Sequence, residues 1–185
     1  MGNAPLHNQA ARQAVDVNVR RYRPSDQGAV IALFREFMWE LTPPALGAEF
    51  QSYVERAIQD ELSRIEEYYF AREGQGFWVA DAHRFVGMAG IERHDEETAE
   101  LRRMAVAKPH RRRGIGRKLL ATAESFCVKA KYRRIVLSTS ELQLPAAQLY
   151  QSSGYVMVRE EKNAHPSHKS AGAGLTRYHY EKLLG

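Results

Sequence analysis

Residues 101–120 carry the feature that most constrains how this chain can fold: a strand, a tight basic turn and the first turns of a helix follow one another directly. We place the strand at 98–106, and it ends before Pro109 because a proline supplies no N–H to a strand ladder. Apolar residues then recur at helical spacing from Ile115 to about residue 131. The corner where this strand meets this helix is therefore the first candidate for a binding site.

The turn itself has the composition of an anion-binding loop. A helix N-terminus leaves backbone N–H groups unpaired and carries partial positive charge. Gly114 and Gly116 remove the Cβ atoms that would hold a ligand away from those donors. Full charges stand beside them on Arg111, Arg112, Arg113 and Arg117. The loop is thus predicted to bind a polyanion such as a pyrophosphate.

The spacing of the loop separates it from other nucleotide-binding loops. A P-loop needs Gly, four residues and then Gly-Lys-Ser/Thr, and a dinucleotide fold needs three glycines near the start of the chain; neither pattern is present. The chain instead has Arg111-Arg-Arg-Gly114-Ile-Gly116 and, further on, Gln143-Leu-Pro-Ala-Ala-Gln-Leu-Tyr150. The two segments, in this order and separation, resemble the GNAT superfamily of acetyl-CoA-dependent N-acetyltransferases. The resemblance covers residues 17–184, nearly the whole chain.

The resemblance implies one α/β domain with a mixed, mostly antiparallel sheet of about six to seven strands and helices on both faces. It also implies that acetyl-CoA lies over the helix N-terminus, with its pantetheine arm along the backbone of the strand. The implied cofactor contacts are Met104, Ala105, Val106, Arg111, Arg112, Arg113, Gly114, Ile115, Gly116, Arg117, Lys118, Gln143 and Tyr150. The cofactor brings an activated acetyl group, so we expect direct attack by an amine in a ternary complex and no metal.

Periodicity along the chain predicts a domain at 17–185 preceded by a polar, alanine-rich tail at 1–16, which we expect to be disordered. Gly154 is predicted to end a short helix. The predicted strands are 17–22, 77–80, 85–92, 98–106, 134–140, 155–159 and 177–182, and the predicted helices are 26–38, 48–67, 115–131 and 145–153. A single cysteine excludes an internal disulfide, and no apolar run reaches the length that spans a bilayer, so we expect a cytoplasmic protein.

Acetyl transfer from a thioester to an amine needs a base for the amine, a donor for the developing oxyanion and an acid for the leaving thiolate. Tyr150 lies in the Ala-x-x-Leu-Tyr segment, where relatives often have a tyrosine near the thioester sulfur, and is the predicted general acid; an aromatic that only packs on its helix is the alternative. Glu100 is the predicted general base, with an exposed ion pair as its alternative role and Glu92 as the alternative base. The oxyanion donor is expected to be a backbone N–H near Met104 or Val106.

The acceptor is left open as a primary amine of a small molecule, an amino-acid derivative or a peptide or protein. Many relatives have an acid at the position of Ser138, and this chain does not. The Thr-Ser-Glu-Leu-Gln run is closer to the branch that acetylates amino acids and cysteine conjugates. Acceptor contacts are expected from the first two helices and the 163–174 loop, with Phe37, Trp39, Phe50, Tyr53 and His165 or His168 as candidates.

The charge distribution gives the alternative function. Between Arg102 and Lys118 there are eight Lys or Arg residues and no acidic one, within a chain of net charge +5. Such a stripe could bind nucleic acid or an acidic partner, with acyl-CoA binding vestigial. Clustering at one strand–loop–helix corner favours a small charged cofactor, so nucleic acid is not the expected partner. Many relatives dimerise through sheet edges, which makes a homodimer one expectation.

Overall fold

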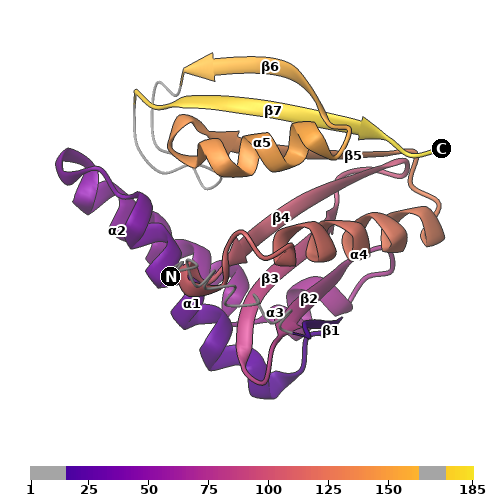
Figure 1. Cartoon of the computed structure of the whole chain (residues 1–185), viewed down its shortest axis with the longest axis horizontal. Helices are drawn as coiled ribbons and strands as arrows, with labels where there is room; N and C mark the ends of the chain where they lie inside the picture. The colour runs from indigo at the N-terminus through magenta and orange to yellow at the C-terminus, as the bar shows by residue number, and fades with distance from the viewer. Residues whose placement is uncertain (1–15, 163–173) are drawn as a thin grey trace, which may run out of the picture.

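The computed structural model describes residues 16–162 and 174–185, whose strands form a seven-stranded sheet in the order β1-β2-β3-β4-β5-β7-β6 (Figure 1). Each neighbouring pair is antiparallel except β4 and β5, which are parallel. The strands are β1 (Asn18–Arg21), β2 (Gly76–Asp81), β3 (Phe85–Arg93), β4 (Thr98–Val106), β5 (Arg134–Ser140), β6 (Val156–Lys162) and β7 (Thr176–Leu183). The mixed, mostly antiparallel sheet predicted from the sequence is confirmed.

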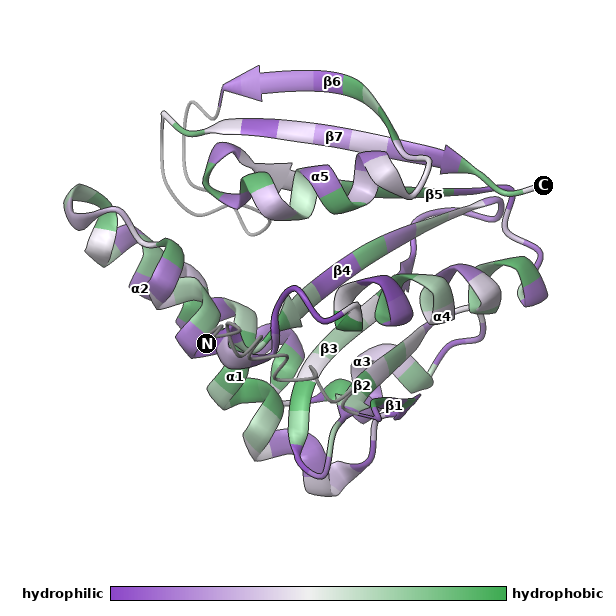
Figure 2. Ribbon diagram, in the orientation of Figure 1, coloured by the Kyte–Doolittle hydropathy of each residue, from purple (hydrophilic) through white to green (hydrophobic). Residues whose placement is uncertain are grey.

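Helices cover both faces of the sheet, as predicted. On one face lie α1 (Gln27–Leu41), α2 (Gly47–Ala57) and α3 (Ile65–Phe70); on the other lie α4 (Ile115–Lys129), packed over β1 to β5, and α5 (Leu144–Ser152), packed on β5 and β6 (Figure 1). Each layer encloses its own hydrophobic core, one under α4 and α5 and one under α1 to α3. Figure 2 shows that α1 and β3 are largely hydrophobic whereas β6 and β7 are mostly hydrophilic, so the apolar packing concentrates on the first half of the sheet.

The second predicted helix, 48–67, is broken in the structure. A π-helical turn (Ile58–Leu62) follows α2, with the Ser63 N–H bonded to the Ile58 carbonyl at 2.7 Å, and Arg64 then leaves helical geometry before α3 begins. The apolar spacing of the segment gave no sign of this break, because Leu62 and Ile65 both still reach the core and are fully buried. The extra residue in the turn allows Glu61, a charged side chain, to face inward as well.

The sheet splits in its middle. The pairing of β4 with β5 runs from Thr98 with Arg134 to Glu100 with Val136 and stops there. Figure 1 shows the two halves of the sheet meeting near the C-terminus and diverging toward the side on which α2 lies. The residues of β4 after Glu100 therefore present one edge to the widening gap rather than to a neighbouring strand.

Two sequence predictions lie largely or wholly outside the described residues: the disordered tail at 1–16, of which only Asp16 is described, and the acceptor candidates His165 and His168 of the 163–174 loop. Gly154 does follow the last turn of α5, with φ of 88°, which is the left-handed geometry expected of a helix-ending glycine. The division into a tail and one domain remains a prediction.

Candidate active site

The predicted anion-binding loop forms the N-terminus of α4. Gly114 caps the helix with φ of 80°, a conformation that L side chains rarely adopt. The Lys118 N–H bonds to the Gly114 carbonyl at 3.0 Å and so begins the intrahelical ladder, which leaves the amides of 115–117 at the open end of the helix. A Cβ on Gly114 would meet nothing within 4 Å, so the glycine itself stands in open space.

Gly116 lies close to side chains of two neighbouring elements. A Cβ there would lie 3.1 Å from Leu149 Cδ2 on α5 and 3.5 Å from Met104 Cε on β4. The N-terminal turn of α4 thus sits directly against the strand and the helix that carry the other predicted site residues. Ile115 is buried in the core, so only its backbone N–H can serve a ligand.

The basic side chains of the loop differ in what they contact. Arg112 and Arg113 are exposed beside the helix N-terminus. The guanidinium of Arg111 makes a bidentate ion pair with Glu40 of α1, at 2.8 and 2.9 Å, and its Nε donates to the Val106 carbonyl at 2.9 Å. This ion pair holds the pKa of the Glu40 carboxyl below its usual value. Arg111 therefore ties the loop to α1 and β4 in addition to adding charge.

Two further side chains of the predicted set contact protein groups on either side of α4. The guanidinium of Arg117 donates to Ser152 Oγ on α5 at 3.3 Å, and the ammonium of Lys118 donates to the Val17 carbonyl at 3.2 Å. Both residues are otherwise exposed. They add positive charge around the loop.

The ladder between β3 and β4 sets which backbone groups face the gap. Val106 pairs with Gly87, and the Ala107 N–H bonds to the Val86 carbonyl at 2.9 Å, which makes Val106 a non-hydrogen-bonded position. Its own N–H and carbonyl therefore point toward the β5 side, whereas those of Ala105 point to β3. Among the predicted backbone contacts, Val106 faces the gap, and Ala105 contributes the adjacent wall.

A cavity of about 170 Å³ occupies the split between the two halves of the sheet. Strands β4 and β5, the short helix α5 and the helices α1 and α2 all contribute to its walls. The predicted site residues that line it are Glu100, Met104, Ala105, Gln143 and Tyr150, together with the acceptor candidates Phe37, Phe50 and Tyr53. Trp39, the remaining described acceptor candidate, is 48% exposed on α1 and does not belong to this lining.

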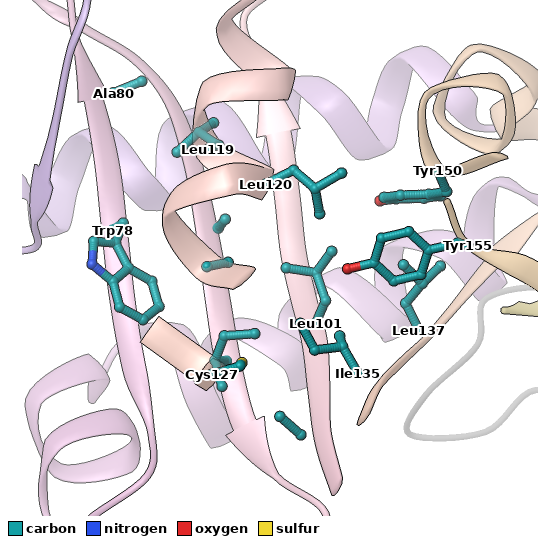
Figure 3. Close-up of a cluster of buried hydrophobic side chains, with 14 of the residues drawn as sticks. Trp78, Ala80, Leu101, Leu119, Leu120, Cys127, Ile135, Leu137, Tyr150 and Tyr155 are labelled. Atoms are coloured by element: carbon teal, nitrogen blue, oxygen red, sulfur yellow. The ribbon is translucent and has the colours of Figure 1, made fainter. Parts of the chain in front are cut away.

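Tyr150 of α5 is buried in the core under α4 and α5 and lines the cavity. Its ring packs against Tyr155 and Tyr180, and its hydroxyl lies 3.7 Å from Met104 Sδ, directed toward β4 (Figure 3). Burial raises the pKa of this hydroxyl, so it keeps its proton at any physiological pH. The ring is therefore a packed aromatic, and the protonated hydroxyl belongs to a residue that lines the cavity.

The two candidate bases occupy different places. Glu100 lines the cavity, at the last residue of β4 that pairs with β5. Glu92 instead accepts hydrogen bonds from the Tyr68 hydroxyl, at 3.0 Å, and from the guanidinium of Arg102, outside the cavity wall. Of the two, Glu100 shares the lining of this cavity with Tyr150, and Glu92 does not.

A β-bulge in β4 explains a pair of arginines that the sequence analysis did not assign. Arg103 has φ of 54°, and the register with β3 shifts at this point, so Arg102 and Arg103 lie on the same face of the sheet. Both donate to the buried carboxylate of Glu61, from Arg102 Nη2 at 3.0 Å and from Arg103 Nε and Nη2 at 2.9 and 2.5 Å. Burial alone would raise the pKa of Glu61, but the two guanidiniums lower it. The carboxylate therefore stays charged, and its hydrogen bonds with the two arginines join the bulge of β4 to the π-helical turn.

Two residues near the end of β5 orient polar groups toward the cavity. The Thr139 hydroxyl donates to the Gln143 side-chain carbonyl at 2.7 Å, which leaves the amide NH2 of Gln143 as the end available to a ligand. Ser138, where relatives often carry an acid, accepts a hydrogen bond from Arg177 of β7 at 2.5 Å. Arg177 was not a predicted site residue; its position at the start of the last strand gave no signal beyond its charge.

No group of three or more His, Cys, Asp or Glu side chains that could hold a metal ion occurs in the part of the chain that the structure describes. Within those same residues, no helix combines the length and the apolar character needed to cross a membrane.

A split sheet with an open strand edge, beside a helix N-terminus that begins at a glycine, defines the class of this protein, and it is the arrangement that the sequence motifs implied. The chain belongs to the acetyltransferase (GNAT) family, whose sequence profile matches residues 33–155.

Similar proteins agree with this assignment. The N-acetylaspartate synthetase of Danio rerio is 34% identical over 135 residues, which are 72% of this chain and 46% of that protein. Human N-acetyltransferase 8 is 34% identical over 56% of this chain and 48% of its own length. The chain thus spans about half the length of these curated relatives.

Solved structures share the fold. A GNAT-family acetyltransferase from Staphylococcus aureus superposes with a TM-score of 0.71 at 25% identity, covering 92% of this chain and all of that one. The Salmonella typhimurium protein yncA, whose structure contains its cofactor acetyl-CoA, superposes with a TM-score of 0.70 at 17% identity, over 91% of this chain and 94% of its own.

Proposed function

We propose that this protein is an N-acetyltransferase that transfers the acetyl group of acetyl-CoA to a primary amine. The observation that carries the proposal is the convergence, in one cavity, of the gap-facing edge of β4, Tyr150 and Glu100, with the N-terminus of α4 packed directly behind Met104. The names of the curated relatives, N-acetylaspartate synthetase and N-acetyltransferase 8, support the same reaction type.

The residues present suit the cofactor. The amides at 115–117, with the exposed Arg112 and Arg113, would hold the pyrophosphate, and the left-handed Gly114 keeps the approach open. The Val106 N–H and the Gln143 amide would bind the pantetheine arm as a strand-like extension of β4. When bound there, acetyl-CoA supplies an activated acetyl group, so the chain has only to position the amine and move protons.

Each proton transfer has a candidate residue. Glu100 accepts a proton from the attacking amine, either directly or through one water. Tyr150 donates a proton toward the leaving sulfur, a role for which burial suits it because the hydroxyl stays protonated. The bulge takes Met104 out of regular pairing with β3, and its N–H is the candidate donor to the oxyanion.

The nucleic-acid alternative has little support in the side chains. Binding of single strands uses exposed aromatics that stack on bases beside the basic groups. Phe77 and Trp78 are buried in β2, and the aromatic ring near Arg111, that of Phe37, lies 5.7 Å from that guanidinium and lines the cavity. The exposed cations of the basic stripe gather around one helix N-terminus, which fits one small polyanion better than a long one; they are Lys108, Arg112, Arg113, Arg117 and Lys118.

Calorimetric titration with acetyl-CoA tests the cofactor site. We expect micromolar binding by the native protein and a loss of at least about tenfold in Gly114→Asp, because the aspartate tolerates the left-handed backbone but places a negative charge beside the pyrophosphate. Gly28→Asp on α1 is the matched control, since a Cβ there also meets open space, and it should bind normally. An absence of binding to the native protein at millimolar acetyl-CoA would refute the proposal.

Release of free thiol then tests the chemistry. With a panel of amines, Tyr150→Phe should lower kcat by about 10- to 1000-fold while the calorimetric affinity for acetyl-CoA stays within about twofold. The phenylalanine keeps the ring packing against Tyr155 and Tyr180, so a loss of turnover reports the hydroxyl alone. Unchanged turnover would remove Tyr150 from the mechanism.

A further inference from the structure

Arg177 is a cation in the acceptor side of the cavity that the proposed chemistry does not use. It lies near the start of β7, paired in register with Ser140 of β5, and its guanidinium donates to Ser138 Oγ across the strands. Glu100 and Tyr53 line the same cavity. The side chain therefore faces the space into which an acceptor amine must enter.

The three arginines that line this cavity differ in their partners. Arg102 and Arg103 share the carboxylate of Glu61, and Arg102 also contacts Glu92. For Arg177, the described residues provide a hydrogen bond to a neutral hydroxyl. Burial lowers the pKa of Arg177, although Tyr53, Glu100 and Glu161 act in the opposite direction. A partly desolvated guanidinium at the wall of a cavity has the capacity to bind an incoming anion.

The cavity joins Arg177 to the residues of the proposed chemistry. Glu100 is paired with Val136, and beyond this pair β4 and β5 diverge, with the bulge adding one residue to β4 before Met104. Ser140, which pairs with Arg177, lies further along β5 on the same side of the gap. Met104, Ser140 and Arg177 all line the cavity of about 170 Å³, so a small acceptor held there can contact Arg177 and reach the site of transfer.

Shape favours a carboxylate as the anion. The planar guanidinium fork matches the two oxygens of a carboxylate, and a charge-assisted pair in a partly dry cavity is stronger than one on the surface. The cavity, at about 170 Å³, also suits a small acceptor. Its walls combine this fork with the carboxylate of Glu100, which would attract the amine, so the two ends of an amino acid meet groups of opposite charge.

We propose that Arg177 binds the carboxylate of the acceptor and thereby selects amino acids over neutral amines and over peptide N-termini. This inference rests on the proposed N-acetyltransferase activity and adds a specificity-determining residue to it. A peptide N-terminus carries an amide where a free amino acid carries a carboxylate, so it lacks the group that Arg177 binds.

The test compares acids with their amides. Each of the common amino acids and its α-carboxamide is assayed with acetyl-CoA by thiol release. For at least one amino acid we expect kcat/KM to exceed that of its amide by about 10- to 100-fold, the range of a charge-assisted hydrogen-bonded pair. In Arg177→Gln the KM of that acid should rise by a similar factor, while the KM of the amide and the calorimetric affinity for acetyl-CoA stay within about twofold.

Two further variants separate specific binding from general charge. Arg177→Lys keeps the charge but not the fork, so it should recover only part of the preference. Arg159→Gln on the neighbouring strand β6 removes an arginine that is 61% exposed, and it should leave the acid-to-amide ratio unchanged.

The outcomes separate the inference from the function on which it rests. Three results would overturn the role of Arg177 while leaving the proposed activity in place, provided that acetyl-CoA binds. These are equal rates with acids and amides, acetylation of peptide amines alone, and equal KM changes for acid and amide in Arg177→Gln. No binding of acetyl-CoA to the native protein overturns the proposed activity and with it this inference.

Discussion

Replacement of Glu61 by glutamine should be among the most destabilising conservative changes in this protein. The carboxylate, buried at 3% exposure, accepts hydrogen bonds from Arg102, Arg103 and the Tyr69 hydroxyl. In Glu61→Gln one oxygen becomes an NH2 group that faces guanidinium donors. Arg103 loses this counter-charge, and Arg102 keeps the carboxylate of Glu92 alone of its two. Breaking a buried ion pair on one side costs about 3–5 kcal/mol, or roughly 6–20 °C in Tm for a chain of this size.

Urea denaturation of the native protein and the variant measures this loss. Glu40→Gln is the matched control, because it breaks a bidentate pair with Arg111 whose acid is 29% exposed, and such a pair contributes less than about 1 kcal/mol. A loss in Glu61→Gln no larger than in the control would refute the electrostatic account of the cluster.

The same pair of proteins gives a second readout in acid. The folded state lowers the pKa of Glu61 below its ordinary value of 4.5, so the stabilisation is complete above pH 4.5 and is lost as pH falls through the lowered value. Glutamine does not titrate. The difference in unfolding free energy between the native protein and Glu61→Gln should therefore shrink well below pH 4.5; a difference that stays constant would contradict the proposed role of the charge.

Two further measurements test the site. Burial raises the pKa of Tyr150, so the hydroxyl should keep its proton and kcat should not fall with rising pH below pH 10, the ordinary pKa of tyrosine. A fall in kcat below pH 10 that disappears in Tyr150→Phe would contradict this. Gly116→Val should lower stability by about 1–3 kcal/mol in thermal denaturation, since even a Cβ approaches Leu149 Cδ2 to 3.1 Å. The matched change Gly28→Val on α1, where a Cβ meets open space, should cost less than about 1 kcal/mol, and equal losses would show that the close approach is not limiting.

The corner between β4 and α4 could be predicted because its signals are local. The limits of β4 and the start of α4 at Ile115 both depend on residues close together in the sequence, and both agree with the structure. Tyr150 could be placed on its short helix in the same way.

The arginine cluster could not be predicted because its partner is distant. Strand alternation assigns Arg102 and Arg103 to opposite faces, and only the bulge brings them to one. Their carboxylate, Glu61, lies some forty residues away on a segment whose apolar spacing predicted an unbroken helix. Two adjacent charges in a buried strand were the available sign of a bulge. Arg177 likewise reaches the cavity only because β7 lies between β5 and β6 in the sheet, an order that the local sequence does not show.

The π-helical turn at 58–62 has a consequence for how this protein can evolve. Each residue in an α-helix rotates the chain by about 100°, so deletion of a single residue from the turn would convert it to regular helix and rotate α2 relative to Glu61 by roughly that angle. Phe50 and Tyr53 would then no longer line the cavity, although neither side chain would have changed chemically. In descendants of this chain, substitutions in α2 should accumulate far more readily than changes in the length of the segment that follows it.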